Sequence, residues 1–383
     1  MNKLIIVGNG FDVHCGLPSR YSDFIKWLIL SSINIENNVK YFSNNLIEIT
    51  SERISFGHNL PKFTTLEELV KHLFDNKFSF KDSETFDFII GEMMFQLKFE
   101  IKSDLVEQLL KHQIEKNWVD IEMIYYRNLK ILLSRLNNTN LRPVFNEDDL
   151  VRINQDLNYL KSYLGTYLKQ VVGDVIVPYN FNYCAEAGID PKIIIDKFHV
   201  EKLSDDGFED ENKKSVKFKN ITFLNFNYTG LPYQLQRGHY KHIDIHGSLF
   251  QHNNIPVFGF GDEIDSDYLE MEKTNNNDFL THIKSFAYFN NTNYKDLIDF
   301  IDSDSYVVYI WGHSCGLSDR TLLNMIFEHD NCAAIKPYYW ERGKGVDNYT
   351  EITQNISRHF KNKLKMRNRV INKQGCYPLG SQD

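Results

Sequence analysis

The stretch that decides the fold is Leu4–Pro18, LIIVGNGFDVHCGLP, close to the amino terminus. Its first four residues are a short, continuous apolar run, which is typical of a strand covered on both faces of a parallel sheet. A glycine-rich turn follows, and the apolar residues of Tyr21–Leu30 predict a helix after it. A strand, a glycine-rich turn and a helix in this order indicate an α/β fold, and such a turn suits the close approach of a phosphate group.

Further apolar runs of this kind lie toward the other end of the chain. They predict strands over residues 221–224, 243–245, 256–258, 306–310 and 333–335, and a helix is expected over 321–328. A single buried strand at Leu4 would leave its edge groups unpaired, so we expect it to pair with strands from 220–340. The fold class predicted is α/β, a Rossmann-like, mostly parallel sheet formed from both chain ends.

The middle of the chain has a different period. Apolar residues recur at helical spacing between residues 64 and 172 and predict helices near 66–73, 105–110, 121–132 and 157–171. Such stripes are more typical of a bundle core than of a cofactor site. The charged stretch 201–217 is expected to be a solvated loop. We therefore expect a discontinuous nucleotide-binding domain, 1–30 and 218–383, and a mainly helical insertion, 31–217. The predicted fold class includes this insertion as a large all-helical one.

Composition excludes several classes of protein. The 383-residue chain has 43 Lys and Arg against 51 Asp and Glu, a net charge of −8, which is poorly suited to wrapping duplex DNA. Its five cysteines are scattered without a CxxC, which argues against a disulfide scaffold or a zinc ribbon. The first apolar run is too short for a signal peptide, and no run approaches the length of a membrane span. A cytoplasmic protein without a metal is expected.

Polar residues follow two of the predicted strands. Asn227 lies in the segment Asn225–Thr229, and His246 opens a His-Gly-Ser turn. Polar residues directly after buried parallel strands lie at the carboxyl edge of the sheet, where open α/β sheets bind ligands. A histidine there suits proton transfer, although a hydrogen-bonded turn histidine is the simpler interpretation. His242 lies four residues before His246, but without an HExxH-like partner the pair does not predict a metal site.

The segment Gly312–Gly316, GHSCG, follows the predicted strand 306–310 and matches GxSxG, the pattern of a nucleophile elbow. This pattern supports an α/β hydrolase with Ser314 as the nucleophile. Asp319 or Asp330, followed by His359, would then have to complete the triad, and no HGGG-type oxyanion loop is present. The same turn also suits ribose or phosphate binding, with Asp319 near the start of the next helix.

Taken together, these motifs resemble the AbiH family of bacterial phage abortive-infection proteins. The resemblance is carried by residues 4–24, 118–122, 226–229, 246–247 and 309–314, and it extends over nearly the whole chain. It implies a role in antiviral defence, with a phage-derived trigger or a partner protein.

A more remote resemblance, to sirtuin-like NAD-binding domains, implies a chemistry. Gly8, Gly10, Gly16, Leu17 and Pro18 match the sirtuin pattern G-A-G-I-S-x-x-x-G-I-P, with Asp12 in place of its serine. The His-Gly at 246 resembles the catalytic His-Gly, and Asn227 the asparagine of Q-N-x-D. The resemblance implies Asn227 and His246 as catalytic residues. It implies cofactor binding by Gly8, Asn9, Gly10, Phe11, Asp12, Pro18, Gly312, His313, Ser314 and Asp319.

The four-cysteine zinc module of the sirtuin deacylases is missing, so the implied reaction is cleavage of NAD⁺ at the nicotinamide N-glycosidic bond, without a metal. Two alternatives stay open: a non-catalytic, nucleotide-binding sensor of infection, and the Ser314 hydrolase. Seven basic residues and no acid occur between Arg358 and Lys373. That segment predicts a solvated terminal helix or a contact with nucleic acid or a phage component. A homo-oligomer is also compatible with the sequence.

Overall fold

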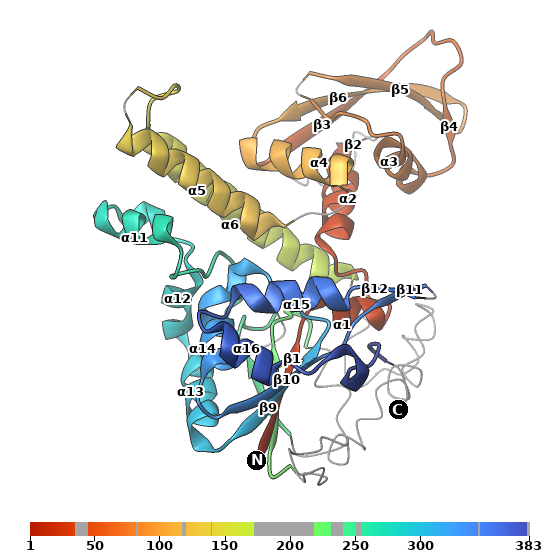
Figure 1. Ribbon diagram of the computed structural model, residues 1–383. Coiled ribbons are helices and arrows are strands. Elements are labelled where there is room, and N and C mark those ends of the chain that lie inside the picture. The colour runs from red at the N-terminus through yellow and green to blue at the C-terminus, as the bar shows by residue number, and fades with distance from the viewer. Residues whose placement is uncertain are drawn as a thin grey trace. The chain divides into compact units, whose positions relative to one another are not determined.

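The computed structural model describes residues 1–34, 45–81, 83–116, 120–138, 140–171, 218–230, 240–249, 254–343 and 345–380 (Figure 1). The chain divides into two compact units. The first unit consists of Met1–Ser19, Leu168–Asn275 and His282–Asp383, and the second of Arg20–Tyr167 and Asn276–Thr281. The predicted loop at 201–217 lies outside the described residues.

The first unit contains a five-stranded parallel sheet. Its strands are β1 (Asn2–Val7), β7 (Ile221–Asn225), β8 (Lys241–Asp244), β9 (Tyr306–Trp311) and β10 (Cys332–Pro337). They lie in the order β10-β9-β1-β7-β8, so β1 is central and pairs with both β7 and β9. The pairing of the first strand with strands from 220–340 is therefore confirmed. The strands add outward from β1 in opposite directions, so the strand order reverses between β1 and β9.

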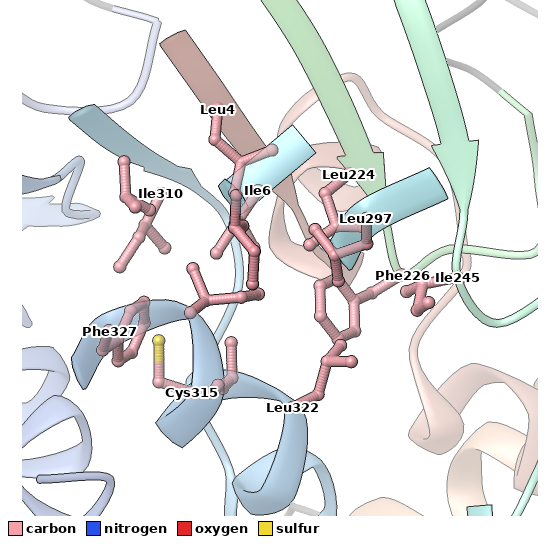
Figure 2. Close-up of a cluster of buried hydrophobic side chains, with 14 of the residues drawn as sticks. Leu4, Ile6, Leu224, Phe226, Ile245, Leu297, Ile310, Cys315, Leu322 and Phe327 are labelled. Atoms are coloured by element: carbon pink, nitrogen blue, oxygen red, sulfur yellow. The ribbon is translucent and has the colours of Figure 1, made fainter. Parts of the chain in front are cut away.

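The apolar runs are continuous because both faces of the central strands are covered. All six residues of β1 and all six of β9 are buried. Leu4, Ile6 and Ile310 belong to a hydrophobic cluster on one face, together with Phe327 of α14 (Arg320–Glu328), as Figure 2 shows. Each large apolar side chain buried in this way contributes about 1.5–3 kcal/mol.

One predicted strand is wrong. Residues 256–258 belong to no strand, although Val257 and Phe258 are buried. The backbone of Val257 is bonded locally instead: its N–H donates to the carbonyl oxygen of His246 at 2.8 Å, and its own carbonyl accepts from the Tyr228 hydroxyl. Apolar character here serves core packing beside the strand ends rather than a sheet ladder.

Shorter elements complete the first unit. They are α1 (Asn9–His14), α11 (Ser266–Lys273), α12 (Lys284–Ala287), η3 (Tyr288–Asn290), α13 (Asn293–Ser303), η4 (Leu317–Asp319), β11 (Glu341–Gly343), β12 (Val346–Asp347), α15 (Tyr349–Arg358), α16 (Lys363–Arg369) and η5 (Lys373–Gly375).

The second unit combines helices with a second sheet. Its helices are α2 (Tyr21–Ser32), α3 (Leu66–Asp75), α4 (Asp104–Lys116), α5 (Ile121–Asn137), α6 (Glu147–Val171), which runs on into the first unit, and η2 (Asn277–Phe279). Its strands are β2 (Ile33–Asn34), β3 (Ile47–Arg53), β4 (Lys62–Phe63), β5 (Thr85–Ile90) and β6 (Met93–Ile101), in the order β2-β3-β6-β5-β4. The predicted helices are confirmed.

The expectation of an all-helical insertion is wrong, because this second sheet lies within residues 31–217. The strand β6 alternates between the two faces of the sheet, and its Phe95, Leu97 and Phe99 are buried. This period of two matches a strand rather than a helix. Trp118, which the family resemblance includes, lies outside the described residues.

Candidate functional site

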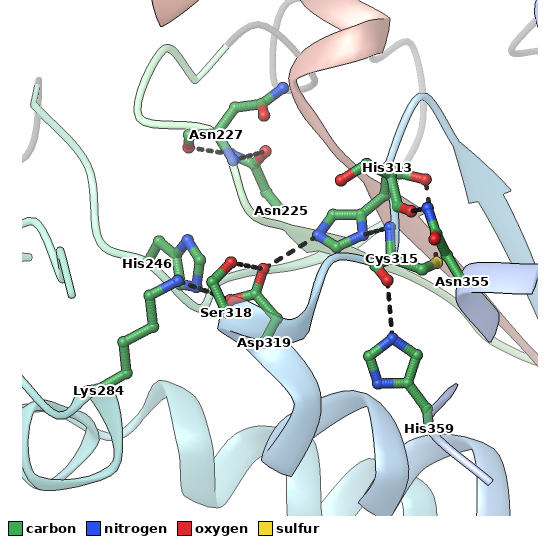
Figure 3. Close-up of polar contacts among 11 residues, drawn as sticks. Asn225, Asn227, His246, Lys284, His313, Cys315, Ser318, Asp319, Asn355 and His359 are labelled. Carbon is green, nitrogen blue, oxygen red and sulfur yellow. Dashed lines mark hydrogen bonds and ion pairs between the residues drawn. The ribbon is translucent and has the colours of Figure 1, made fainter. Parts of the chain in front are cut away.

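Buried polar side chains gather after four strands of the parallel sheet. Asp12 follows β1, Asn227 follows β7, His246 follows β8 and His313 follows β9, and all four are buried. Because the carboxyl ends of parallel strands meet at one edge, these residues share that edge. Hydrogen bonds and ion pairs join them into two networks, one around Asp12 and one around Asp319. Figure 3 shows the network around Asp319.

The glycine turns after β1 and β9 are packed against each other. The N–H of Gly10 donates to the carbonyl oxygen of Gly312 at 2.8 Å. A Cβ on Gly10 would lie 2.6 Å from that same oxygen, and a Cβ on Gly8 would lie 2.5 Å from the Cα of His313. The glycines therefore permit two backbones to meet where the strand order reverses. Their role in cofactor binding stays a prediction.

The network around Asp12 orients Asn227. The Asn227 side-chain amide donates from Nδ2 to Asp12 Oδ1 at 2.8 Å, and the Thr229 hydroxyl donates to Asp12 Oδ2 at 2.6 Å. Burial raises the pKa of Asp12 to about 7, against the lowering effect of these two hydrogen bonds. A buried carboxyl that titrates near neutrality is typical of functional sites.

The backbone of Asn227 is held by a neighbour at the end of β7. Asn225 Oδ1 accepts from the N–H of Asn227 at 3.0 Å, and Asn225 Nδ2 donates to the carbonyl oxygen of Asn227 at 3.0 Å. The same Nδ2 donates to Asp244 Oδ1 at 2.9 Å. The turn after β7 is thereby tied to β8, and Asn227 has little freedom to rotate.

The second network is centred on Asp319, in the short helix η4. Asp319 Oδ1 lies 2.7 Å from Lys284 Nζ and 3.1 Å from His246 Nε2. Asp319 Oδ2 lies 3.6 Å from His313 Nε2. The ring of Phe226 contacts both histidines, with centroid distances of 4.9 Å to His246 and 4.3 Å to His313. One carboxylate thus joins two strand-end histidines and a lysine.

Asp319 is ionised although it is buried. Burial by itself would raise the pKa of Asp319, but the charge of Lys284 and the contact with His246 together hold that pKa well below its usual range. The ionised carboxylate 3.1 Å from His246 Nε2 favours a proton on that nitrogen, which leaves Nδ1 as the basic atom of the His246 imidazole. A carboxylate that fixes a histidine tautomer in this way prepares it for general base catalysis.

The orientation of His313 is also fixed. The N–H of Cys315 donates to His313 Nδ1 at 3.0 Å, so Nδ1 is an acceptor and the proton lies on Nε2, toward Asp319. Cys315 has a positive φ of 52°, which bends the loop so that this contact forms. Burial raises the pKa of the Cys315 thiol well above its usual value, so the thiol stays protonated.

The geometry argues against the Ser314 hydrolase. Ser314 is exposed, but His359 Nε2 faces the carbonyl oxygen of Cys315 at 2.8 Å rather than a carboxylate. Burial lowers the pKa of His359 to about 4. The two candidate acids are engaged elsewhere, Asp319 with Lys284 and Asp330 with Lys365. A serine–histidine–acid relay is therefore not assembled among these residues.

The remaining predicted residues have local contacts. Asn9 Oδ1 accepts from the Ser19 hydroxyl at 2.6 Å, and the ring of Phe11 stacks on Trp311 with a centroid distance of 5.9 Å. Pro18 is half-buried. These contacts shape the turn after β1. None of them tests a role in cofactor binding.

Sequence reasoning missed three members of the site. Asn225 and Thr229 flank Asn227 in a segment that was singled out, so the strand-end rule could have included them. Lys284 had no such signal, because it belongs to no motif and its partner lies 35 residues away.

Part of the basic segment 358–373 is paired within the protein. Lys365 Nζ lies 2.8 Å from Asp330 Oδ1, and Lys373 Nζ lies 2.5 Å from Asp347 Oδ2. Arg369 donates to the carbonyl oxygen of Phe327. Contact of this segment with nucleic acid stays a prediction.

Two further features were sought among the described residues: a group of metal-ligating side chains and a helix that could span a membrane. No group of three or more His, Cys, Asp or Glu side chains lies there in a metal-binding arrangement. Within the same residues, no helix has the length and apolar character needed to span a bilayer.

Fold and site together define a mixed α/β protein with a five-stranded parallel sheet and a buried polar site at the carboxyl ends of four of its strands. Comparison with protein families extends this description. Residues 4–340 match the family described as "Bacteriophage abortive infection AbiH". The match covers most of the chain, so the protein belongs to the AbiH family, as the motifs predicted. A search of curated proteins found no match.

Proposed function

We propose that this protein acts in abortive infection by cleaving NAD⁺ at the bond between nicotinamide and ribose. Family membership indicates the defence role. The observation that carries the proposed chemistry is the contact of His246 Nε2 with the buried Asp319 carboxylate at 3.1 Å. It supplies a histidine of favoured tautomer at the carboxyl edge of the parallel sheet, the edge that also carries Asn227.

The strand order supports a nucleotide as the substrate. Numbered along the chain, the five strands lie in the order 3-2-1-4-5, the order of Rossmann-like folds, which bind nucleotides where that order reverses. In this protein the reversal lies between β1 and β9. The turns after these two strands carry Asp12 and His313, one from each polar network.

The proposed reaction adds water to the ribose. The glycosidic bond breaks as nicotinamide leaves in its neutral form, and the sugar passes through an oxocarbenium-like state. His246 Nδ1 takes a proton from the attacking water, whose oxygen bonds to the anomeric carbon, and the proton then passes to solvent. Asn227, held by Asp12, orients the ribose and the water. The products are ADP-ribose, nicotinamide and one proton.

A second candidate function is a nucleotide-binding sensor without catalysis. The specific observation in its favour is that both carboxylates of the site are satisfied within the protein. Both oxygens of Asp12 accept hydrogen bonds from the protein, and Asp319 is neutralised by Lys284. A site of this kind keeps its geometry without a substrate.

The deciding experiment measures NAD⁺ and nicotinamide in phage-infected cells that express the protein, and in parallel with the purified protein. We expect NAD⁺ loss with the wild type, and turnover reduced ~10²–10⁴-fold by His246→Ala, the usual scale for removal of a general base. Asn227→Ala should also be severe, through lost orientation.

The matched control is His329→Ala. His329 is a partly exposed histidine that also pairs with an aspartate, Asp302 at 3.1 Å, but it lies at the end of α14, just before β10 begins. The His329→Ala variant should lose NAD⁺ at the wild-type rate. Full phage protection by His246→Ala, at normal protein level, would end the proposal, and binding of NAD⁺ without release of nicotinamide would favour the sensor.

A further inference from the structure

Lys284 is a buried lysine that no sequence motif marks. It begins α12, and its side chain has no exposed surface. Its Nζ donates to Asp319 Oδ1 at 2.7 Å. Removing an ammonium group from water is costly unless a charged partner compensates. Packing alone does not explain a fully buried lysine, so the ion pair with Asp319 is what compensates the burial of Lys284.

The oxygen that Lys284 contacts is the one that contacts His246. Asp319 Oδ1 lies 2.7 Å from Lys284 Nζ and 3.1 Å from His246 Nε2 (Figure 3). Any change in the charge or rotation of this carboxylate alters its ion pair with His246 Nε2. Lys284 thus acts on the histidine through Asp319.

Comparison of two buried aspartates in this chain, Asp12 and Asp319, indicates the effect of the lysine. Asp12 and Asp319 are both buried at the same edge of the sheet. Asp12 receives hydrogen bonds from the neutral Asn227 and Thr229, and burial raises its pKa to about 7. The pKa of Asp319 is instead held low, with the charge of Lys284 opposing the effect of burial.

We propose that Lys284 is a positioning residue of this site. Its ion pair keeps Asp319 charged and turned toward His246, and thereby fixes the proton of His246 on Nε2. The catalytic meaning of this role rests on the proposed function, but its test does not require turnover.

Four groups around His246 bear on its titration in this arrangement. Asp319 from η4 stabilises the imidazolium form, while the positive charge of Lys284 from α12 opposes it. His313, after β9, shares Asp319 through its other oxygen, and the ring of Tyr228, after β7, lies 6.3 Å from the His246 ring. Removal of Lys284 takes away the positive charge that competes with His246 for Asp319, so the pKa of His246 should rise.

The experiment is an NMR titration of the full chain labelled with ¹³C and ¹⁵N in histidine. His246→Gln identifies the resonances of His246. In the wild type, we expect the proton on Nε2 across neutral pH. Lys284→Met should raise the pKa of His246 by about one pH unit, on the scale of a nearby charge. Lys284→Arg, which keeps the charge, should restore the wild-type titration.

The double variant Lys284→Met/Asp319→Asn guards against a folding failure of the single variant, because it removes both buried charges together. In it, His246 should lose both the anionic acceptor and the fixed tautomer. If the pKa and the tautomer of His246 are unchanged in Lys284→Met, the inference is overturned. If Lys284→Met does not fold, the same unchanged result in the double variant overturns it. A wild type that fails to release nicotinamide would count against the proposed function alone.

Discussion

Replacement of Asp12 by asparagine should change how the stability of the protein depends on pH. The Asp12 carboxyl is fully buried, and its pKa in the folded protein is about 7 instead of its usual 3.8. Below pH 3.8 it is protonated in both states. Between 3.8 and about 7 the unfolded chain releases this proton while the folded protein keeps it, so the free energy of unfolding falls as pH rises.

The size of the effect follows from the two pKa values. At about 1.4 kcal/mol per pH unit, the interval from 3.8 to about 7 corresponds to about 4 kcal/mol of stability lost by pH 8. The introduced asparagine would keep both hydrogen bonds, because its Oδ1 accepts from Asn227 and its Nδ2 donates to the Thr229 hydroxyl. The Asp12→Asn variant should therefore equal the wild type near pH 4 and exceed its stability by about 4 kcal/mol at pH 8.

The assay is urea unfolding at a series of pH values, followed by hydrogen exchange of the β1 peptide, which reports on the unit that contains Asp12. The difference between variant and wild type cancels every other titrating group. The control is Asp330→Asn, because Asp330 is exposed and Lys365 lowers its pKa, so its effect should be small and opposite in sign. A difference curve for Asp12→Asn that is flat between pH 4 and 8 would refute the reasoning.

Two further predictions concern the loops of the site. Gly312→Ala should abolish the cooperative unfolding transition, because the φ of Gly312 is +66° and an added Cβ would lie 2.0 Å from the backbone nitrogen of Phe11. Gly16→Ala, at φ +90° with open space around the residue, should lower the free energy of unfolding by only ~1–2 kcal/mol. Equal losses of stability for the two variants in thermal melts would contradict this contrast. Ser314→Ala should reduce nicotinamide release far less than His246→Ala, because His313 and His359 are oriented toward partners other than Ser314. Complete loss of activity in Ser314→Ala, together with fluorophosphonate labelling of Ser314, would restore the hydrolase hypothesis.

Much of the parallel sheet could be predicted because its strands are short apolar runs that end at polar or glycine-containing turns. Such runs are local features, so the strands at 4–7, 221–224 and 306–310 were found close to their bounds. The strands β5 and β6 were missed although the alternation at Phe95, Leu97 and Phe99 was readable. The helical stripes on both sides of these strands dominate the apolar pattern of this part of the chain.

The position of the polar residues at the strand ends could be predicted from the sequence alone, because each of them follows its own strand directly. Asn227 and His246 could therefore be placed at one edge of the sheet before any coordinates existed. What the glycines do required the tertiary structure, since the partner of Gly10 is Gly312, about 300 residues along the chain.

The ionisation of the site was also decided only by the tertiary structure. Asp12 and Asp319 are both aspartates near a strand end, and nothing local distinguishes them. Folding buries both, surrounds Asp12 with neutral donors and brings Lys284 to Asp319. The charge state of a buried group depends on which partners share its low-dielectric surroundings, and those partners come from distant segments that only the completed fold brings together.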